Sequence, residues 1–470
     1  MVSECRTHAG GEYSLRVGVW QQPNSVRCVD ARQEGRKLDR LIHALNGSGK
    51  FESALRYATR YVEVAPEVDR SWCCLSWTCH RLGDIHTAFT AGRRAVELSP
   101  DMEWALRTYV RALLSAGKPG VALEYARSAT RLSPQDSGGW LALAQCCLTL
   151  CCDDETIAAV ERAASLAPER IEVTMATVTM WRKKDPSHAI ALCLDRLRSD
   201  PDSIQLLLTL AYAYFWGEQY EPAQSLLKSV LGDWPGDSHA NRLYAYSIGA
   251  LGTAEQGAQA SRTYLESAVR KYEDKSRQHP DWYAPHRDRA LSLRMLGRHS
   301  DALEACQAAQ ELPGGEDDAY LWKRMAFSLA SLERWSLALE AIERAVDLDP
   351  SSPLYMIDAA EIAFLSTRPD DVDAWTQRII EGSPQSGLIE KARALRQMAC
   401  GNYVDGLNHL ENYDWSQSPL NSCRMCEQAL CSARIGDVVA ARQLLERADY
   451  AAPLCGCEWR QAANAVVAAD

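Results

Sequence analysis

The sequence predicts an all-α fold, an α-solenoid in which antiparallel helix pairs follow one another along almost the whole chain. Three observations predict it: prolines recur at a nearly constant spacing, small residues recur at two fixed places within each period, and glycine recurs between them. A fixed period of roughly 20 to 50 residues is typical of repeat architectures, in which each unit buries its apolar side only against its neighbours.

The prolines mark the period. They are separated by 33 to 37 residues, with one longer gap of 45 residues. Because proline cannot continue a helix, each is expected to end one helix pair and to precede the next. The series is Pro66, Pro100, Pro134, Pro168, Pro201, Pro235, Pro280, Pro313, Pro350, Pro384, Pro419 and Pro453.

Within each period, three further positions carry the same kind of residue when the proline is numbered 32. Position 8 is usually small, and position 20 is alanine at Ala54, Ala88, Ala122, Ala189, Ala223, Ala302, Ala338 and Ala441. Small residues at these two positions let two antiparallel helices approach closely. Position 15 is glycine at Gly49, Gly83, Gly117, Gly252, Gly297, Gly401 and Gly436, which supplies the left-handed residue that ends a first helix. Position 4 is tryptophan at Trp72, Trp140 and Trp322.

This pattern resembles the tetratricopeptide repeat, a helix-turn-helix unit with the motif W-x2-L-G-x2-Y…A…P. The resemblance covers residues 35–453, which hold twelve units in register. It implies about 25 helices in a right-handed superhelix, with the first helix of each unit lining the concave surface.

The segments follow in order. Residues 1–34 lack the pattern and are expected to be partly extended or without regular structure. Residues 35–235 hold units one to six, residues 281–453 hold units eight to twelve, and residues 454–470 are expected to form one capping helix, which the open end of a solenoid needs.

Unit seven, residues 236–280, contains eleven extra residues. Eleven residues make about three helical turns, so a helix can lengthen by that amount without rotating its faces. We therefore expect an extended second helix that projects from the solenoid over residues 254–277.

Composition excludes several classes of function. The net charge of −11 argues against general binding of nucleic acid, and the sequence has no run of eighteen apolar residues that would insert into a membrane. The amino terminus lacks the features of a secretory signal, so a cytoplasmic protein is expected. No phosphate loop, dinucleotide fingerprint or hydrolase motif is present, so we expect no enzyme activity, no cofactor and no small-molecule substrate.

Cysteines form two groups that could bind a metal. In "LALAQCCLTLCCDDE" the cysteines Cys146, Cys147, Cys151 and Cys152 fall at core and turn positions of the repeat, so packing is the preferred interpretation. Cys423, Cys426, Cys455 and Cys457 are a second candidate, since stacking of neighbouring units could bring four thiolates together for structural zinc. Packing is preferred there too, because the spacing is not that of a standard zinc finger.

The predicted concave groove is basic. In the resembling family, positions 2, 5, 9 and 12 of each first helix line it, and here these positions hold nine basic residues and two acidic ones, Asp39 and Glu361. The basic residues are Arg36, Arg70, Arg107, Arg111, Arg242, Arg287, Arg294, Lys323 and Lys391. The aromatic residues Trp77, Trp104, Tyr246, Tyr320 and Phe327 accompany them, either as apolar anchors for a partner or as packing between repeats.

Two hypotheses of function follow. The first is a non-enzymatic scaffold that holds an acidic or extended segment of a partner protein in this groove. The second is a regulatory arm that docks on a separately encoded enzyme through residues 254–277. Asp39 and His43, one helical turn apart, could orient a catalytic imidazole, but helix faces bring such pairs together commonly.

Overall fold

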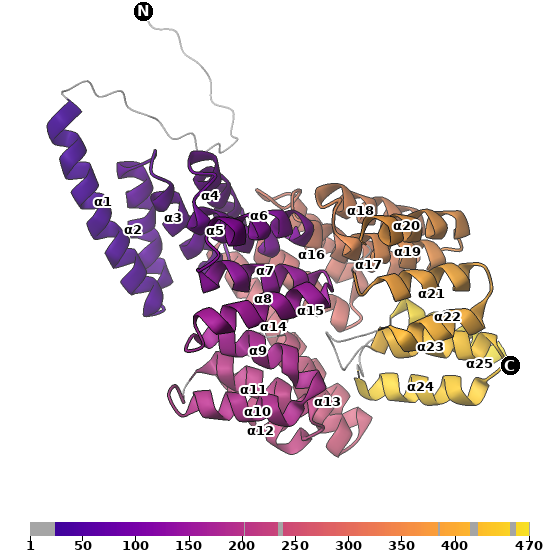
Figure 1. The fold of residues 1–470 in the computed structure, drawn as a ribbon. Helices are drawn as coiled ribbons and strands as arrows, with labels where there is room; N and C mark the ends of the chain where they lie inside the picture. The colour runs from indigo at the N-terminus through magenta and orange to yellow at the C-terminus, as the bar shows by residue number, and fades with distance from the viewer. Residues whose placement is uncertain are drawn as a thin grey trace, which may run out of the picture.

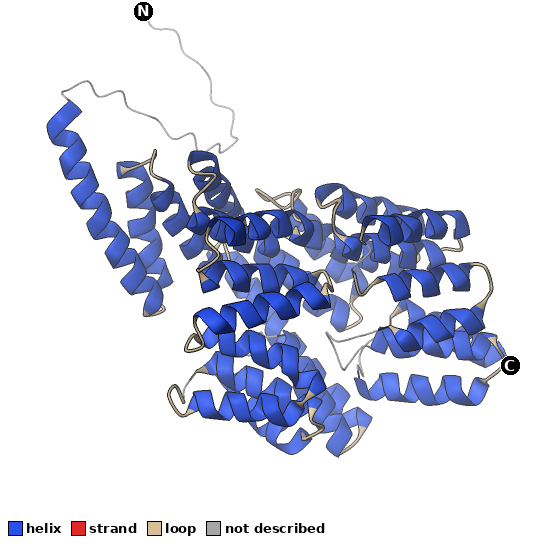
Figure 2. Cartoon of the chain, in the orientation of Figure 1, coloured by secondary structure: helices blue, strands red, loops and turns tan. Residues whose placement is uncertain are grey.

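The computed structural model describes residues 24–201, 203–233, 238–383, 386–413, 422–451 and 457–469. Every regular element in these ranges is a helix, and no strand occurs among them (Figure 2). Consecutive helices pack as antiparallel pairs from α1/α2 to α23/α24, and α25 follows them (Figure 1). The predicted all-α solenoid of helix pairs is therefore confirmed.

The helices have the following bounds. They are α1 Asn24–Gly47, α2 Phe51–Val64, α3 Asp69–Leu82, α4 Ile85–Leu98, α5 Glu103–Ser115, α6 Pro119–Leu132, α7 Ser137–Thr149, α8 Asp153–Leu166, α9 Ile171–Lys184, α10 Pro186–Leu197, α11 Ile204–Trp216, α12 Tyr220–Asp233, α13 Ser238–Leu251, α14 Ala254–Gln278, α15 Tyr283–Met295, α16 His299–Gln310, α17 Ala319–Ser331, α18 Trp335–Leu348, α19 Pro353–Leu365, α20 Pro369–Gly382, α21 Ile389–Ala399, α22 Tyr403–Asn412, α23 Ser422–Arg434, α24 Val438–Ala451 and α25 Glu458–Ala469. The first of these begins at Asn24, so part of the segment expected to lack regular structure is helical.

The repeated small residues lie where two helices of a pair meet. All eight alanines at position 20, from Ala54 to Ala441, are fully buried. At position 8, Ala211, Ala326 and Ala360 are fully buried as well. A larger side chain in place of these alanines would push the paired helices apart.

The turn between the two helices of a unit needs a left-handed residue. Six of the seven glycines at position 15 have a positive φ, and Gly252 is the exception. The helix after Gly252 begins with a capping box formed by Thr253 and Gln256. In four other units Cys151, Glu218, Glu333 and Thr367 adopt a positive φ, between 56° and 61°. The backbone geometry is thus retained where glycine is absent.

The three tryptophans at position 4 make the same hydrogen bond. The indole Nε1 of Trp72 donates to the carbonyl of Pro66 at 2.7 Å, and that of Trp140 donates to the carbonyl of Pro134 at 3.0 Å. Trp322 donates to the carbonyl of Glu316 at 2.9 Å. Each ring therefore ties the start of a first helix to the loop six residues before it.

The long helix α14 does not stand free of the array. Its 25 residues bury one face at Ser261, Leu265, Ala268 and Val269. Near its carboxyl end the Lys275 ammonium donates to the carbonyl of Leu82 at 2.8 Å, where α3 ends. The segment 254–277 therefore does not project freely along its whole length, because Lys275 in its last turns contacts the end of α3.

The array coils back so that its second half meets the turns of its first half; we name these contacts the inter-turn interface. The backbone N–H of Gly120 donates to Asp349 at 2.8 Å, and that of Ala319 donates to the carbonyl of Ala116 at 3.2 Å. The N–H of Gly387 donates to the carbonyl of Cys151 at 2.7 Å. Together with the Lys275–Leu82 bond, these contacts join residues 193 to 236 positions apart, which corresponds to six or seven repeats. Figure 1 shows α5, α6 and α7 beside helices of the second half.

Candidate partner-binding groove

The carboxyl-terminal half of the predicted groove is covered by the chain itself. Trp459, in the first turn of α25, stacks on Phe364 with the ring centroids 5.3 Å apart, and its Nε1 donates to Glu361 at 3.4 Å. The neighbouring Glu458 accepts a hydrogen bond from Ser331 of α17. Glu361 and Phe364 occupy positions 9 and 12 of their unit, so α25 lies across residues that were expected to face a partner.

Three basic residues of this half are paired with carboxylates, most of which lie outside the four groove positions. Arg287 is only 7% exposed, and its guanidinium contacts Asp318 at 2.6 Å and the carbonyl of Ser115 at 2.8 Å. Lys323 pairs with Asp358 at 2.6 Å. Buried Lys391 pairs with Glu361 and with Glu427. The expectation that Arg287, Lys323 and Lys391 offer positive charge to a partner is therefore wrong.

The other predicted residues of the second half also take part in packing. Arg294 lies 5.5 Å from the centre of the Phe327 ring, and Lys323 approaches the same ring at 5.8 Å. Tyr320 packs edge-on against Tyr355 at 6.3 Å, within the inter-turn interface. The interpretation as packing between repeats holds for Tyr320. The side chains of Arg242 and Tyr246 lie outside the described residues.

The amino-terminal half contains a cluster of aromatic and charged side chains from three successive first helices. His43 of α1 lies between Trp77 of α3 and Trp104 of α5, with ring centroids 5.6 and 5.8 Å away. Arg70 donates to Asp39 at 2.8 Å and lies over Trp104 at 5.0 Å. The sequence predicted that Arg70, Trp77 and Trp104 belong to one groove. It did not predict that His43 lies between the two tryptophans. Arg36 of the same half is exposed on α1.

Beside this cluster, two carboxylates balance the positive charge of Arg107. Its guanidinium lies 3.1 Å from Glu103 and 3.5 Å from Asp136, the residue that caps α7. Burial raises the pKa of Glu103 to about 7, although the charge of Arg107 opposes that shift. Arg107 is therefore held in place within the protein.

Arg111 lies one helical turn further along α5, and its positive charge is not balanced by an ion pair of this kind. Within the described part of the chain, no carboxylate oxygen lies within 4.0 Å of its guanidinium. Burial, and then the charge of Arg107, lowers the pKa of Arg111 to about 10. His80 faces it from α3 as a neutral ring, since burial and the charge of Arg111 lower the pKa of His80 to about 4. A partly buried cation without an ion-pair partner within 4.0 Å favours an anionic ligand, although Glu172 and Glu103 act on it from further away.

One residue of this half was missed by sequence reasoning. Arg182 of α9 stands one position after the last groove position of its unit, and it lies 5.4 Å from the centre of the Tyr212 ring. Its Nε is buried and has no hydrogen-bond partner in the structure. Burial lowers the pKa of Arg182. Arg182 is not at one of the four groove positions (2, 5, 9 and 12), although the sequence does place it at the end of a first helix.

The cysteines follow the packing interpretation where they are described. Cys146 and Cys147 are fully buried, and Cys151 is the left-handed turn residue of its unit. In the second group, Cys426 and Cys457 approach each other, and their hydrogen bond lowers the pKa of the Cys426 thiol. The side chain of Cys423 and the whole of Cys455 lie outside the described residues. Zinc at these four cysteines therefore stays a hypothesis.

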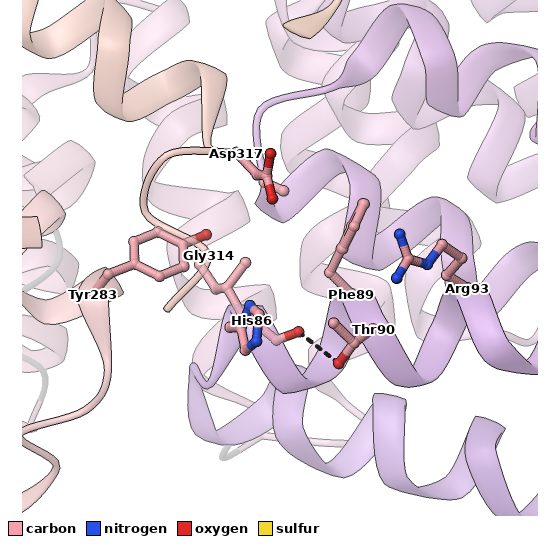
Figure 3. A pocket seen from close by; sticks show the side chains of 9 residues that line it. His86, Phe89, Thr90, Arg93, Tyr283, Gly314 and Asp317 are labelled. Carbon is pink, nitrogen blue, oxygen red and sulfur yellow. Dashed lines mark hydrogen bonds between the residues drawn. The ribbon is translucent and has the colours of Figure 1, made fainter. Parts of the chain in front are cut away.

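A small cavity of about 120 Å³ opens at the inter-turn interface (Figure 3). His86, Phe89 and Arg93 of α4 line one side, and Tyr283 and Asp317 line the other. Small-molecule sites usually have volumes of about 300 to 1,000 Å³. The cavity is too small for such a ligand, and the groove of the amino-terminal half is the better candidate site.

A family model described as a tetratricopeptide repeat matches residues 103–146, whereas no curated protein sequence matches the chain. The crystal structure of TTC0263, a thermophilic TPR protein in Thermus thermophilus, shares 20% identity, covers 38% of this chain and 98% of that chain, and has a TM-score of 0.36. The crystal structure of the APC/C hetero-tetramer Cut9-Hcn1 shares 12% identity, covers 95% of this chain and 99% of that chain, and has a TM-score of 0.33.

Two further observations belong with these. The segment matched by the family model contains Arg107 and Arg111. Among the described helices, none combines the length and the apolar character that crossing a bilayer requires.

Proposed function

We propose that the chain is a tetratricopeptide-repeat protein and a non-enzymatic scaffold, whose groove between α1 and α9 binds an acidic, extended segment of a partner protein. The surface that this proposal requires, a partner-binding groove, is the usual functional part of tetratricopeptide arrays. The proposal needs no cofactor and no catalytic residue.

The observation that carries the proposal is the unpaired cation of Arg111. A charge that is partly removed from water without a counter-charge is unfavourable in the free protein. A carboxylate placed against it recovers that energy as a charge-assisted hydrogen bond, which arginine can make with two parallel N–H groups. The unpaired charge of Arg111 in the free protein therefore favours the binding of an anionic ligand.

The neighbouring side chains support an extended protein segment as the ligand. Trp77 and Trp104 offer apolar surface within the same groove, and aromatic residues are frequent anchors at protein interfaces. Arg182 presents a second buried donor without a partner, on α9. A ligand that reaches from α3 to α9 must be longer than one side chain, which favours a peptide over a single small anion.

The alternative, docking through residues 254–277, has weaker support. One face of α14 is covered by neighbouring helices, and Lys275 is bonded to the end of α3. Its remaining face is polar and exposed, which is the ordinary condition of a surface helix.

The first experiment uses defined peptides and a matched pair of variants. Fluorescence anisotropy would compare binding of extended peptides rich in Asp and Glu with that of their Asn and Gln counterparts. We expect the acidic peptides to bind more tightly, and Arg111→Gln to weaken that binding at least about tenfold. Arg56→Gln, which removes an exposed arginine from the second helix α2, is the control and should change nothing.

A stability measurement makes this test sharper. Since the charge of Arg111 is unfavourable in the free protein, Arg111→Gln should keep or raise the melting temperature while binding falls. Equal binding of acidic and neutral peptides, or equal behaviour of the Arg111 and Arg56 variants, would show that the groove does not select anions. A photo-crosslinker at Glu266, on the exposed face of α14, that captures the peptide better than one at Arg36 would favour the docking-arm alternative instead.

A further inference from the structure

Three side chains of different chemistry converge at the amino-terminal end of the groove. Asp39 Oδ1, His43 Nε2 and Cys74 Sγ all lie within 4.8 Å of one another. The Oδ1–Nε2 distance is 3.6 Å and the Oδ1–Sγ distance is 3.5 Å. Zinc with bonds of about 2.0 to 2.3 Å in tetrahedral geometry separates its ligand atoms by roughly 3.3 to 3.8 Å. Two of the three separations already fit.

The helices hold these ligands in a common direction. Asp39 and His43 stand four residues apart, so they share one face of α1, and Cys74 of α3 faces them. The His43 ring is held between Trp77 and Trp104, and its buried Nε2 has no hydrogen-bond partner in the structure. An imidazole nitrogen that is fixed, buried and unsatisfied is well placed to bind a metal.

From this geometry we propose that Asp39, His43 and Cys74 form a Zn²⁺ site. The carboxylate, imidazole and thiolate are the three ligand types that zinc takes in proteins. Three protein ligands leave a fourth position on a tetrahedral zinc ion, which is filled by water or by a side chain of a partner. The site does not depend on the acidic-peptide proposal.

Arg70 supports the site from outside. Its Nε donates to Asp39 Oδ1 at 2.8 Å, and a carboxylate oxygen has a second lone pair for a metal. Ligating carboxylates are commonly hydrogen-bonded in this manner, which orients them. The guanidinium is half exposed and lies over Trp104, so it can also move away from the added positive charge.

Zinc binding at this site must release a proton. The thiol of Cys74 loses its proton to solvent as the Zn–S bond forms, while Asp39 binds through a carboxylate oxygen and His43 through the Nε2 lone pair. Burial, and then the charge of Asp39, raises the pKa of Cys74, so the thiol is protonated in the free protein. The other titratable or charged groups that act on these residues are Tyr61 of α2 and Asp69, Arg70 and Cys73 of α3.

The test uses the full chain, stripped of metal with a chelator, and Zn²⁺ alone as the probe. Calorimetry should give one equivalent more for the wild type than for Cys74→Ser or His43→Gln. Cys73→Ser is the matched control, because Cys73 is the adjacent, equally buried thiol on α3 and is not part of the cluster. The comparison by difference removes any contribution from the cysteines near the carboxyl terminus.

Cobalt gives a second readout. Co²⁺ bound to the wild type and to Cys73→Ser should show the absorption of a tetrahedral thiolate complex, and both cluster variants should lose it. If Cys74→Ser fails to fold, His43→Gln decides alone, since its side chain is partly exposed. An unchanged number of equivalents in His43→Gln, or an equal loss in the Cys73 control, would overturn the proposal.

Discussion

The charged side chain of Arg287 is buried. Its guanidinium contacts Asp318 and Asp288, and it also donates to the carbonyl of Ser115 from the opposite part of the coil. Burying such a group is costly unless every donor is satisfied, and here carboxylates and a carbonyl satisfy it. Removing the guanidinium would leave Asp318 without its counter-charge and would leave Asp288 with Arg324 alone.

We therefore predict that Arg287→Ala lowers the free energy of unfolding by about 3 to 5 kcal/mol. Arg298→Ala is the control, because Arg298 forms an exposed pair with Asp301 and should change stability by less than about 1 kcal/mol. Urea denaturation of both variants measures the difference. Equal small effects would mean that the Arg287 network contributes no more than a surface ion pair.

Glu427 predicts a dependence of stability on pH. Burial raises the pKa of Glu427 to about 7, although Lys391 opposes the shift, and Glu361 adds to it. A carboxyl with a raised folded pKa contributes stability that is complete below its ordinary pKa of 4.5 and is lost as the pH rises through about 7. Wild-type stability should therefore fall between pH 5 and pH 8 relative to Glu427→Gln, measured as melting temperature at each pH. Parallel profiles for the two proteins would contradict this prediction.

At the residue scale, sequence reasoning succeeded where contacts are local. The position-20 alanines and most position-15 glycines have the burial and the φ that their spacing predicted, because both depend on the adjacent helix or turn. It failed for Lys323 and Lys391, because Asp358 and Glu427 come from the next unit and fall outside the four groove positions. It found Arg70 and Arg111 but had no local signal to separate paired from unpaired cations.

Among the elements, α25 has a different role from the one that its sequence indicated. A capping helix was expected after the last unit, and α25 does pack there, burying Trp459 and Ala463. It also reaches α17 and α19, through Glu458 and Trp459. Its place across the groove depends on the curvature of five preceding units, which no local pattern of residues encodes. The same is true of α14, whose length could be inferred but whose contact with α3 could not.

Trp459→Ala should detach this helix. A buried tryptophan replaced by alanine costs about 3 to 5 kcal/mol. Amide exchange within residues 458–469 should therefore become much faster, and the melting temperature should fall. Val439→Ala, at an exposed position of α24, is the control and should leave both unchanged. Exchange in α25 that matches the wild type would show that Trp459 does not hold the helix in place.

For the whole molecule, the close approach between successive coils can be tested at one glycine. Gly117 has a φ of 72°, and a Cβ there would lie 2.6 Å from the backbone nitrogen of Tyr320. Gly297 has a φ of 75° at the equivalent turn, with no atom within 4 Å of the added carbon. The two positions share the conformational cost of a left-handed residue and differ only in the contact between coils.

Gly297→Ala should therefore lower stability by about 1 to 2 kcal/mol, the cost of left-handed backbone in a residue with a side chain. Gly117→Ala should cost a further 1 to 3 kcal/mol or so, because the backbone of Tyr320 must move. Denaturant unfolding of the two variants measures the gap. Equal losses would mean that the coils do not touch at this point in solution.

The inter-turn interface also decides how the molecule responds to force. A superhelix whose coils do not touch extends like a spring, since each repeat needs to tilt only slightly against the next. Here hydrogen bonds of the inter-turn interface join one coil to the next, among them the Asp349–Gly120 bond and the Lys275–Leu82 bond. Tension applied at the two ends must break these inter-turn hydrogen bonds before the repeats can tilt. The coil is therefore stiff at small extension and becomes compliant only after the bonds have broken. The groove between α1 and α9 would then keep its shape while the molecule is pulled.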